Sequence, residues 1–222
     1  MKNSKNILEK IMNKIIITSV ITINAILLTS CGPKMPTYID PSINYNSMTK
    51  GGIVVFPPGG SKGSNSISNE TARIFAEKLD TNYPKINILG PRQTKSIIAK
   101  NNLIEEYIAL LSTNVKLGIW DNNKLMQLSK AFESRYLVFP IINIRYHQEM
   151  QFDLLDSTTS ISDEYNVKLD LMIWDSKNKK NVFENSSEGE PGSSFLNLFQ
   201  DPKYRAAEDA ADEAVEFFPF DK

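Results

Sequence analysis

The chain has 222 residues, of which 41% are hydrophobic and 23% are charged, and its formal net charge at pH 7 is −1. This charge gives no electrostatic reason to expect a nucleic-acid partner, and a single cysteine excludes an internal disulfide. The hydrophobic content is sufficient for the core of one domain of ordinary size.

A basic segment followed by an apolar one opens the chain. The first 14 residues contain four lysines and one glutamate, and residues 15–28 are nearly all apolar. This order is typical of a secretory signal. The apolar part is short for a permanent membrane-spanning helix, which needs about 17–25 residues. An uncleaved amino-terminal anchor is the alternative interpretation.

The stretch Leu28-Thr29-Ser30-Cys31-Gly32 contains the only cysteine and resembles the lipobox of bacterial lipoproteins. The resemblance implies that residues 1–30 are a signal peptide, that Cys31 receives a diacylglyceryl group, and that its new amino group is acylated after cleavage. Two or more acyl chains anchor a protein stably, at about 0.8 kcal/mol per buried CH₂. Gly32 in place of aspartate is compatible with sorting to the outer membrane. We therefore expect a lipid-anchored protein of the bacterial cell envelope, on the periplasmic face of the outer membrane.

Residues 31–49 follow the leader, and they are predicted to be the lipidated cysteine and an extended tether. Three prolines and many small polar residues favour such a tether over a packed element. The apolar residues Tyr38, Ile39, Ile43 and Tyr45 leave open that part of it packs on the domain. Residues 50–222 are then expected to form a single periplasmic α/β domain.

Hydrophobic periodicity predicts alternating strands and helices over this domain. The clearest strand runs from Tyr165 to Trp174, where apolar residues alternate with polar ones and predict one buried face. Pro140 interrupts another β-rich run and suggests a bulge or an edge position. The order β-α-β-α-α-β-β-β-α predicts an α+β fold, an α/β sandwich with a mixed sheet of about five strands. The expected strands cover residues 53–56, 86–89, 136–146, 165–174 and 181–190, and the first and last helices cover 68–83 and 201–218. Between residues 93 and 132 the pattern predicts two or three helical stretches, within 93–100, 104–111 and 121–132.

Two sequence patterns resemble a known periplasmic domain. The strand Val54-Val55-Phe56-Pro57 leads into a helix, and a later hairpin joins an aliphatic strand ending in Trp174-Asp175 to Val182-Phe183 through a polar turn. This order resembles the domain shared by the curli-secretion lipoprotein, the lipoprotein activators of penicillin-binding proteins, and the amino-terminal domain of the TolB translocation protein. The resemblance covers about residues 50–218. It implies no catalytic residues, since none are known for the fold.

Other residue patterns give no basis for catalysis, a metal or a cofactor. The glycine-rich loop 59–63 lacks the spacings of phosphate-binding loops and is expected to be a flexible surface loop. His147 is the only histidine, so a zinc site is not expected, and it is expected to be exposed at a strand end. Glu188 and Glu190 form a carboxylate pair without a predicted groove. The acidic face of the last helix is either solvated or a docking surface.

Two functions remain for the chain, and an enzyme is less favoured than either. The first is an adaptor that binds another envelope protein, through an exposed loop or short hairpin over residues 147–163 that carries Met150, Phe152 and Leu154. The second is a subunit of an outer-membrane secretion pore of the curli-secretion type, which would be a homo-oligomer. A pore strand needs about 9–11 alternating residues, and Ser157 to Ser162 breaks the alternation here. The adaptor is therefore favoured.

Overall fold

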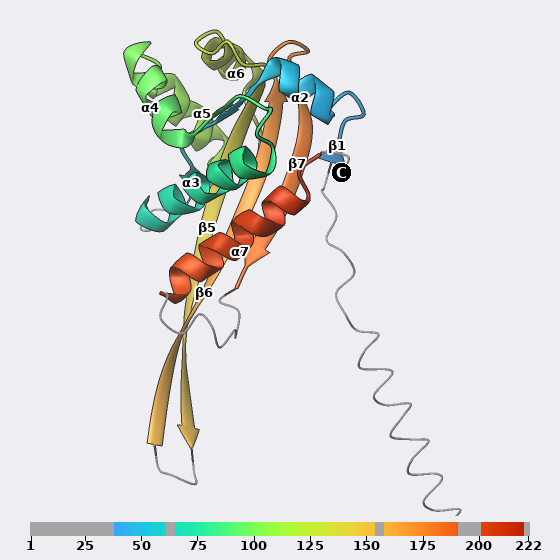
Figure 1. Ribbon diagram of the computed structural model, residues 1–222. Coiled ribbons are helices and arrows are strands. Elements are labelled where there is room, and N and C mark those ends of the chain that lie inside the picture. Colours follow the sequence, from blue (N-terminus) through green and yellow to red (C-terminus); the bar gives the residue numbers. More distant parts are fainter. Residues whose placement is uncertain (1–37, 61–64, 154–157, 191–200, 220–222) are drawn as a thin grey trace, which may run out of the picture. The chain divides into compact units, whose positions relative to one another are not determined.

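The structure is a computed structural model that describes residues 38–60, 65–153, 158–190 and 201–219, with the backbone alone for 60, 65, 148–153 and 158–164 (Figure 1). The described chain contains both helices and strands. They are β1 (Tyr38–Ile39), α2 (Tyr45–Gly51), β2 (Ile53–Val55), β3 (Gly59–Gly60), α3 (Asn65–Asn82), β4 (Ile88–Leu89), α4 (Pro91–Lys100), α5 (Ile104–Leu117), α6 (Asn122–Ser129), β5 (Tyr136–Asp153), β6 (Thr158–Asp175), β7 (Lys180–Gly189) and α7 (Pro202–Glu216).

All strands of the described chain belong to one mixed sheet. The strand order is β1-β7-β6-β5-β2-β4, and β3 pairs with β5 beyond the end of β2. The pairs β1–β7, β7–β6 and β6–β5 are antiparallel, whereas β2 runs parallel to both β4 and β5. The predicted α+β fold is thus confirmed. The sheet has seven strands instead of about five, because the two-residue strands β1 and β3 carry too few residues for a periodic signal.

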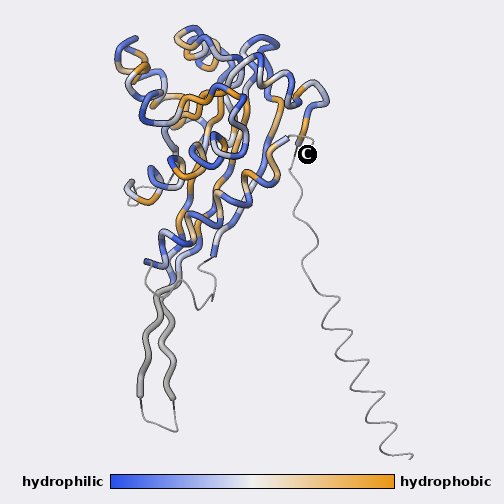
Figure 2. Tube along the Cα trace, viewed as in Figure 1, coloured by the Kyte–Doolittle hydropathy of each residue, from blue (hydrophilic) through white to orange (hydrophobic). Residues whose placement is uncertain are grey.

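Helices cover both faces of the sheet, and Figure 2 shows apolar residues concentrated between the layers. One face packs against α2, α3 and α7, and the other packs against α4, α5 and α6. We call the core under α2, α3 and α7 the first core, and the core under α4, α5 and α6 the second core. Alternate residues of β5 point to opposite faces of the sheet, so Val138 lies in the first core and Phe139 in the second. In the second core the ring of Phe56 stacks on Phe139, with 4.3 Å between the ring centres.

Strand β6 serves both layers as well, which corrects the prediction of a single buried face. Leu169, Leu171 and Ile173 lie in the first core as expected. Met172 and Trp174, on the opposite face, are also buried, because α5 and α6 cover this end of the strand. The prediction rested on the polar residues Asn166, Lys168 and Asp170 in the first part of the strand. The same face carries apolar residues further along, so the alternation of polar and apolar residues does not continue to the end of the strand.

The chain before residue 50 contains regular structure, so residues 38–49 do not form the predicted extended tether. They pack on the domain, which is the alternative that their apolar residues left open. Strand β1 extends the sheet, and the backbone N–H of Asp40 donates to the carbonyl of Val182 at 2.9 Å. Helix α2 then starts with a capping box in which Asn44 and Ser47 bond to each other's backbone N–H groups. Its residue Met48 is completely buried. The folded domain therefore includes the described residues from Tyr38 onward, and residues 31–37 lie outside the described part.

Pro140 lies at a local edge within the sheet. The antiparallel register of β5 with β6 runs through Pro140 without a bulge. On the other side of β5, β2 pairs only as far as Val138, and β3 begins to pair at Ile141. On that side the carbonyl of Val138 accepts a hydrogen bond from the backbone N–H of Phe56. Backbone groups two residues apart in a strand point to the same side, so the nitrogen of Pro140 also points there. Neither β2 nor β3 pairs with Pro140. The predicted edge position is confirmed.

At Gly189, helix α7 lies directly against the backbone of β7. Its buried face consists largely of alanines, and Gly189 of β7 lies against it. A Cβ atom at Gly189 would lie 1.9 Å from the carbonyl oxygen of Ala206 and 2.4 Å from the nitrogen of Ala210. At its start, Asp201 caps the helix and Pro202 occupies the first turn, as predicted.

Candidate functional site

Strands β5 and β6 continue beyond the rest of the sheet as a two-stranded ribbon, which Figure 1 shows below the helices. The last pair that β7 makes joins Gly189 to Val167, and the last pair that β3 makes joins Gly60 to Ile142. From Arg145 to Asp153 and from Thr158 to Asn166, these strands pair with no other strand of the described chain. We call these two segments the ribbon. The sequence predicted a loop or short hairpin here, and the structure instead extends both strands.

The register of the ribbon separates its apolar residues from its polar ones. Residues opposite each other in an antiparallel pair lie on the same face, and successive residues alternate between faces. One face carries the pairs Tyr146–Tyr165, Gln148–Asp163, Met150–Ile161 and Phe152–Thr159, and the other carries Arg145–Asn166, His147–Glu164, Glu149–Ser162, Gln151–Ser160 and Asp153–Thr158. The first face is mainly apolar and the second is entirely polar.

Two of the three residues predicted to bind a partner thus share the apolar face of the ribbon. They are Met150 and Phe152, whereas Leu154 lies outside the described residues. Sequence reasoning missed Ile161 and Tyr165 on the same face, because it judged the second strand alone and saw only a serine-rich break. The pairing register, which the sequence does not give directly, is the signal that identifies them.

Side chains at the base of the ribbon show how exposed this face is. The rings of Tyr146 and Tyr165 lie against each other with 5.1 Å between their centres. Even with this contact, Tyr146 is 53% exposed. His147 is exposed as predicted, although it lies within a strand instead of at a strand end.

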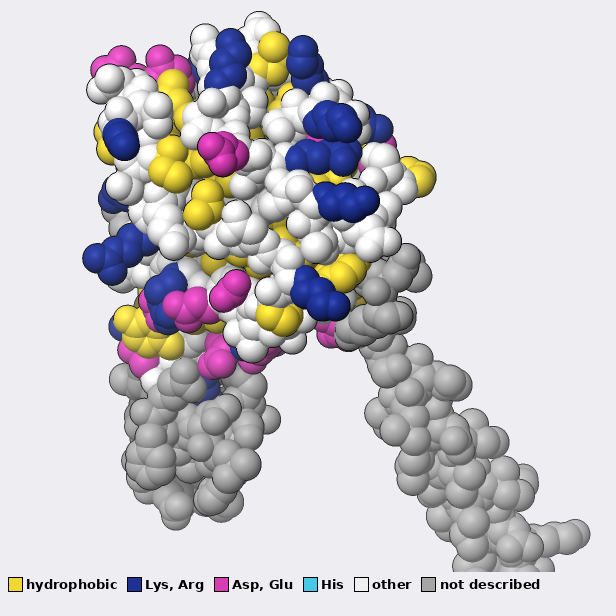
Figure 3. All heavy atoms as spheres, turned by 45° about the horizontal axis from the view of Figure 1, so that its top comes forward, with side chains coloured by type: hydrophobic (Ala, Val, Ile, Leu, Met, Phe, Trp, Pro, Cys, Tyr) yellow, Lys and Arg dark blue, Asp and Glu magenta, His cyan; other side chains and the backbone are white. Residues whose placement is uncertain are grey.

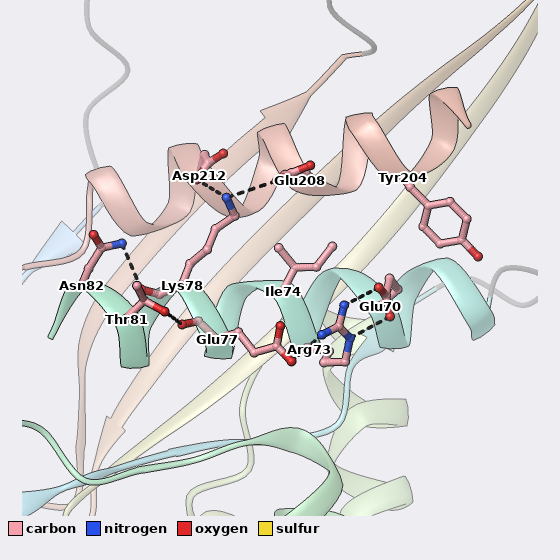
Figure 4. A pocket seen from close by; sticks show the side chains of 10 residues that line it. All are labelled: Glu70, Arg73, Ile74, Glu77, Lys78, Thr81, Asn82, Tyr204, Glu208 and Asp212. Atoms are coloured by element: carbon pink, nitrogen blue, oxygen red, sulfur yellow. Dashed lines mark hydrogen bonds and ion pairs between the residues drawn. The ribbon is translucent and has the colours of Figure 1, made fainter. Parts of the chain in front are cut away.

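A charged groove of about 680 Å³ runs between α3 and α7 on the sheet face away from α5 (Figure 4). In it, Lys78 Nζ lies 2.6 Å from Asp212 Oδ1 and 3.6 Å from Glu208 Oε1. Arg73 pairs with Glu70 and Glu77 along α3. These hydrogen bonds from Arg73 lower the pKa of Glu70. The acidic face predicted for the last helix is therefore partly used to tie α7 to α3.

The turn between β6 and β7 is built around the buried carboxylate of Asp175. Burial would raise the pKa of Asp175, but the hydrogen bonds from Arg135 and from the backbone of Asn178 and Lys177 outweigh it and lower this pKa. The aspartate that ends the aliphatic strand in the sequence pattern thus has a structural role. Figure 3 shows Lys and Arg side chains gathered at this end of the domain, and those of Lys177 and Lys179 are exposed.

The glycine-rich segment does not form the expected flexible loop where the structure describes it. Gly59 and Gly60 form β3, and a Cβ atom at Gly59 would lie 2.7 Å from Ile141 Cδ1 and 2.9 Å from Leu111 Cδ2. Residues 61–64 lie outside the described part. Glu188 and Glu190 are both exposed, and the backbone N–H of Glu188 donates to Glu213 Oε2 at 2.6 Å.

The described residues contain no group of three or more histidine, cysteine, aspartate or glutamate side chains that could hold a metal ion. None of the helices described, α2 to α7, is both long enough and apolar enough to cross a membrane.

Comparison with known proteins gives likenesses of structure only. No protein-family model matches the chain, and no curated protein is similar to it in sequence. The PelC dodecamer from Paraburkholderia phytofirmans aligns with a TM-score of 0.47 at 10% identity, over 83% of this chain and 95% of PelC. The hypothetical protein CT253 from Chlamydia trachomatis aligns with a TM-score of 0.45 at 11% identity, over 75% of this chain and 94% of CT253.

The LpoB C-terminal domain from Salmonella enterica aligns less closely, with a TM-score of 0.37 at 8% identity, over 67% of this chain and 86% of that domain. Lipoprotein GNA1162 from Neisseria meningitidis is also similar, with 16% identity and a TM-score of 0.33, over 64% of this chain and 84% of that protein. A lipoprotein is thus among the similar structures. With every TM-score below 0.5, these likenesses do not decide what the chain does.

Proposed function

We propose that this chain is a lipid-anchored lipoprotein of the bacterial envelope that binds another envelope protein through the apolar face of its ribbon. The lipobox-like stretch that contains Cys31 supports the anchor, and Gly32 in place of aspartate is compatible with the outer membrane. The ribbon supports the binding role, because its two strands leave the sheet and carry most of their apolar residues on one face. The proposed role needs no catalytic group.

A ribbon of this kind gains stability from a partner. An isolated two-stranded hairpin is marginally stable in water, and three or more strands or a packed helix are needed for independent stability. Both edges of the ribbon also carry backbone N–H and C=O groups that no third strand of the described chain satisfies. A protein that covers the apolar face would stabilise the hairpin, and one that pairs with an edge would satisfy these backbone groups.

A subunit of a secretion pore is the second candidate, and the length of the ribbon favours it. Each strand of the ribbon has nine residues, and a membrane-crossing strand needs about 9–11. The pair Gln148–Asp163 opposes it, because this pair lies in the middle of the apolar face. A carboxylate facing lipid is unfavourable, most of all near the middle of the bilayer. The adaptor is therefore the better-supported function.

The test replaces Met150, Phe152 and Leu154 with serine in the lipidated protein and measures partner capture by crosslinking in intact envelopes. The matched control replaces Glu149, Gln151 and Asp153, on the polar face of the same strand, with serine. We expect the first variant to lose the crosslinked partner and the control to keep it, with melting temperatures of both close to that of the parent.

Two outcomes would count against the adaptor. If the apolar-face variant captured the same partner at the same yield, the ribbon would not be the docking surface. If the lipidated protein formed rings that conduct ions in planar bilayers, the pore would be the better description.

A further inference from the structure

We propose that the carboxyl-terminal end of α5 and the edge strand β1 form a surface that rests on the lipid bilayer to which Cys31 is anchored. We call this the α5–β1 surface; its residues are Tyr38, Val115, Lys116, Leu117 and Ile119. The inference rests on the proposed lipidation of Cys31 but not on the ribbon, which belongs to another part of the fold.

The first observation is the short length of chain between the anchor and the domain. Tyr38 is fixed in the sheet by its pairing with β7, and seven residue steps separate it from Cys31. At about 3.3–3.6 Å per residue, these steps span at most about 25 Å. A folded domain of this size has a radius of gyration of about 16 Å, hence a width of about 40 Å. The connection is thus shorter than the domain is wide, and it keeps the side that carries β1 near the bilayer.

The second observation is that the end of α5 lies on this side. Tyr38 pairs with Glu184 of β7, so both lie on the sheet face that α5 and α6 cover. Glu184 in turn lines a hollow of about 260 Å³ together with Asn114 and Gly118 at the end of α5. The end of this helix and Glu184 of β7, the strand that pairs with β1, therefore border the same hollow.

The third observation is the chemistry of the exposed side chains. Val115, Leu117 and Ile119 are 58%, 68% and 57% exposed, and Tyr38 is 42% exposed. Helix α5 ends at Gly118 in the left-handed conformation, with Leu117 and Ile119 on either side of it. Aliphatic side chains beside lysine, with a tyrosine nearby, are typical of protein surfaces at the membrane interface.

Lysines of the neighbouring turn add positive charge close to β1. Lys180 Nζ lies 2.6 Å from Asp40 Oδ2, immediately after β1. Lys177 and Lys179 of the same turn are exposed. Lysines near a bilayer are attracted to anionic headgroups, so phosphatidylglycerol should strengthen the contact.

The experiment uses the full-length protein isolated with its lipid and reconstituted in vesicles of phosphatidylcholine with or without phosphatidylglycerol. Because Cys31 carries the lipid and the chain has no other cysteine, a single added cysteine takes a fluorescent label selectively. The test position is Leu117→Cys. The control position is Thr81→Cys, exposed at the end of α3 on the opposite face of the sheet. Vesicle flotation of each labelled sample measures whether the protein is anchored to the vesicles, independently of the quenching of its label.

We expect headgroup-attached quenchers to quench the label at position 117 at least about threefold more than the label at position 81, with a larger ratio in phosphatidylglycerol. Replacing Val115 and Ile119 with serine should reduce this ratio without lowering the melting temperature, since both side chains are exposed.

Equal quenching of the two labels in protein that floats would overturn the α5–β1 surface and leave the anchor intact. Protein that fails to float would overturn the anchor, and this inference with it. A label at position 117 shielded only in whole envelopes would show that a protein covers the surface, which also contradicts the inference.

Discussion

Arg135 holds Asp175 by two parallel hydrogen bonds, from Nε to Oδ1 at 2.9 Å and from Nη2 to Oδ2 at 2.5 Å. Asp175 is completely buried, and the pair joins the start of β5 to the end of β6. Removing one partner of a buried ion pair leaves an uncompensated charge. We expect Arg135→Met to lower the free energy of unfolding by about 3 kcal/mol in urea denaturation. Arg73→Met, in a half-exposed pair, should cost at most about 1 kcal/mol.

The same pair makes stability depend on acid pH. Because the pKa of Asp175 is lowered from 3.8 in the folded state, the unfolded chain binds the proton more readily. The stabilisation is therefore present above about pH 4 and is lost as the pH falls from there through the folded pKa. Asp175→Asn should be less stable than the parent at pH 7, and the difference should shrink on acidification. Thermal melts between pH 7 and pH 3 measure this, and a constant difference would contradict it.

The close contact between β7 and α7 predicts that an alanine substitution at Gly189 strongly destabilises the fold. In Gly189→Ala the new Cβ would meet backbone atoms of Ala206 and Ala210 at 1.9 and 2.4 Å, so the helix has to move. We expect a loss of about 3 kcal/mol or more in stability. Gly118→Ala is the control, because its Cβ would meet nothing within 4 Å. It should cost only the left-handed backbone strain, about 1–2 kcal/mol.

Helix α2 should contribute to stability, which a tether would not do. Met48→Ala removes a completely buried side chain and should destabilise the protein by about 3 kcal/mol. Asn46→Ala, exposed on the same helix, should change the stability by less than about 0.5 kcal/mol. Equal, small effects of both substitutions would restore the interpretation of residues 38–49 as a tether.

Cys31 carries the prediction about the anchor. Cys31→Ala should leave an unprocessed precursor, because both cleavage and acylation depend on the modified thiol in the lipoproteins that the leader resembles. Metabolic labelling with a palmitate analogue should give a band in the parent and none in the variant. If the Cys31→Ala variant still carried the label, the lipid would be attached at another residue and the prediction would be wrong.

Local signals explain which elements the sequence predicts well. Ile53–Val55 is a run of β-branched residues between glycines and prolines, and Asp121 caps α6 through two backbone N–H groups. Such signals involve only a few neighbouring residues, so they can be recognised in the sequence without knowledge of the rest of the fold. Asp201 and Pro202 mark the start of α7 for the same reason.

The elements that the sequence missed depend on distant partners. Strand β1 consists of two residues held by Phe183 and Glu184, and α2 is held by Met48 in a core that other elements complete. The apolar face of the ribbon requires the register that sets Ile161 opposite Met150. Neither a short window nor a periodicity can supply these pairings, because they join residues that are separated in the chain.

The position of β2 beside β5 has a consequence for how the chain reaches this structure. Ile53 pairs with Tyr136, about 80 residues later, and closing such a loop costs more entropy than closing the short turn between β6 and β7. We therefore expect the β6–β7 hairpin to form early in refolding, and β2 to join β5 late. Pulsed hydrogen exchange would show amide protection in Ile173 and Phe183 before Val54. Protection that arose first in β2 would mean that the central parallel pair nucleates folding.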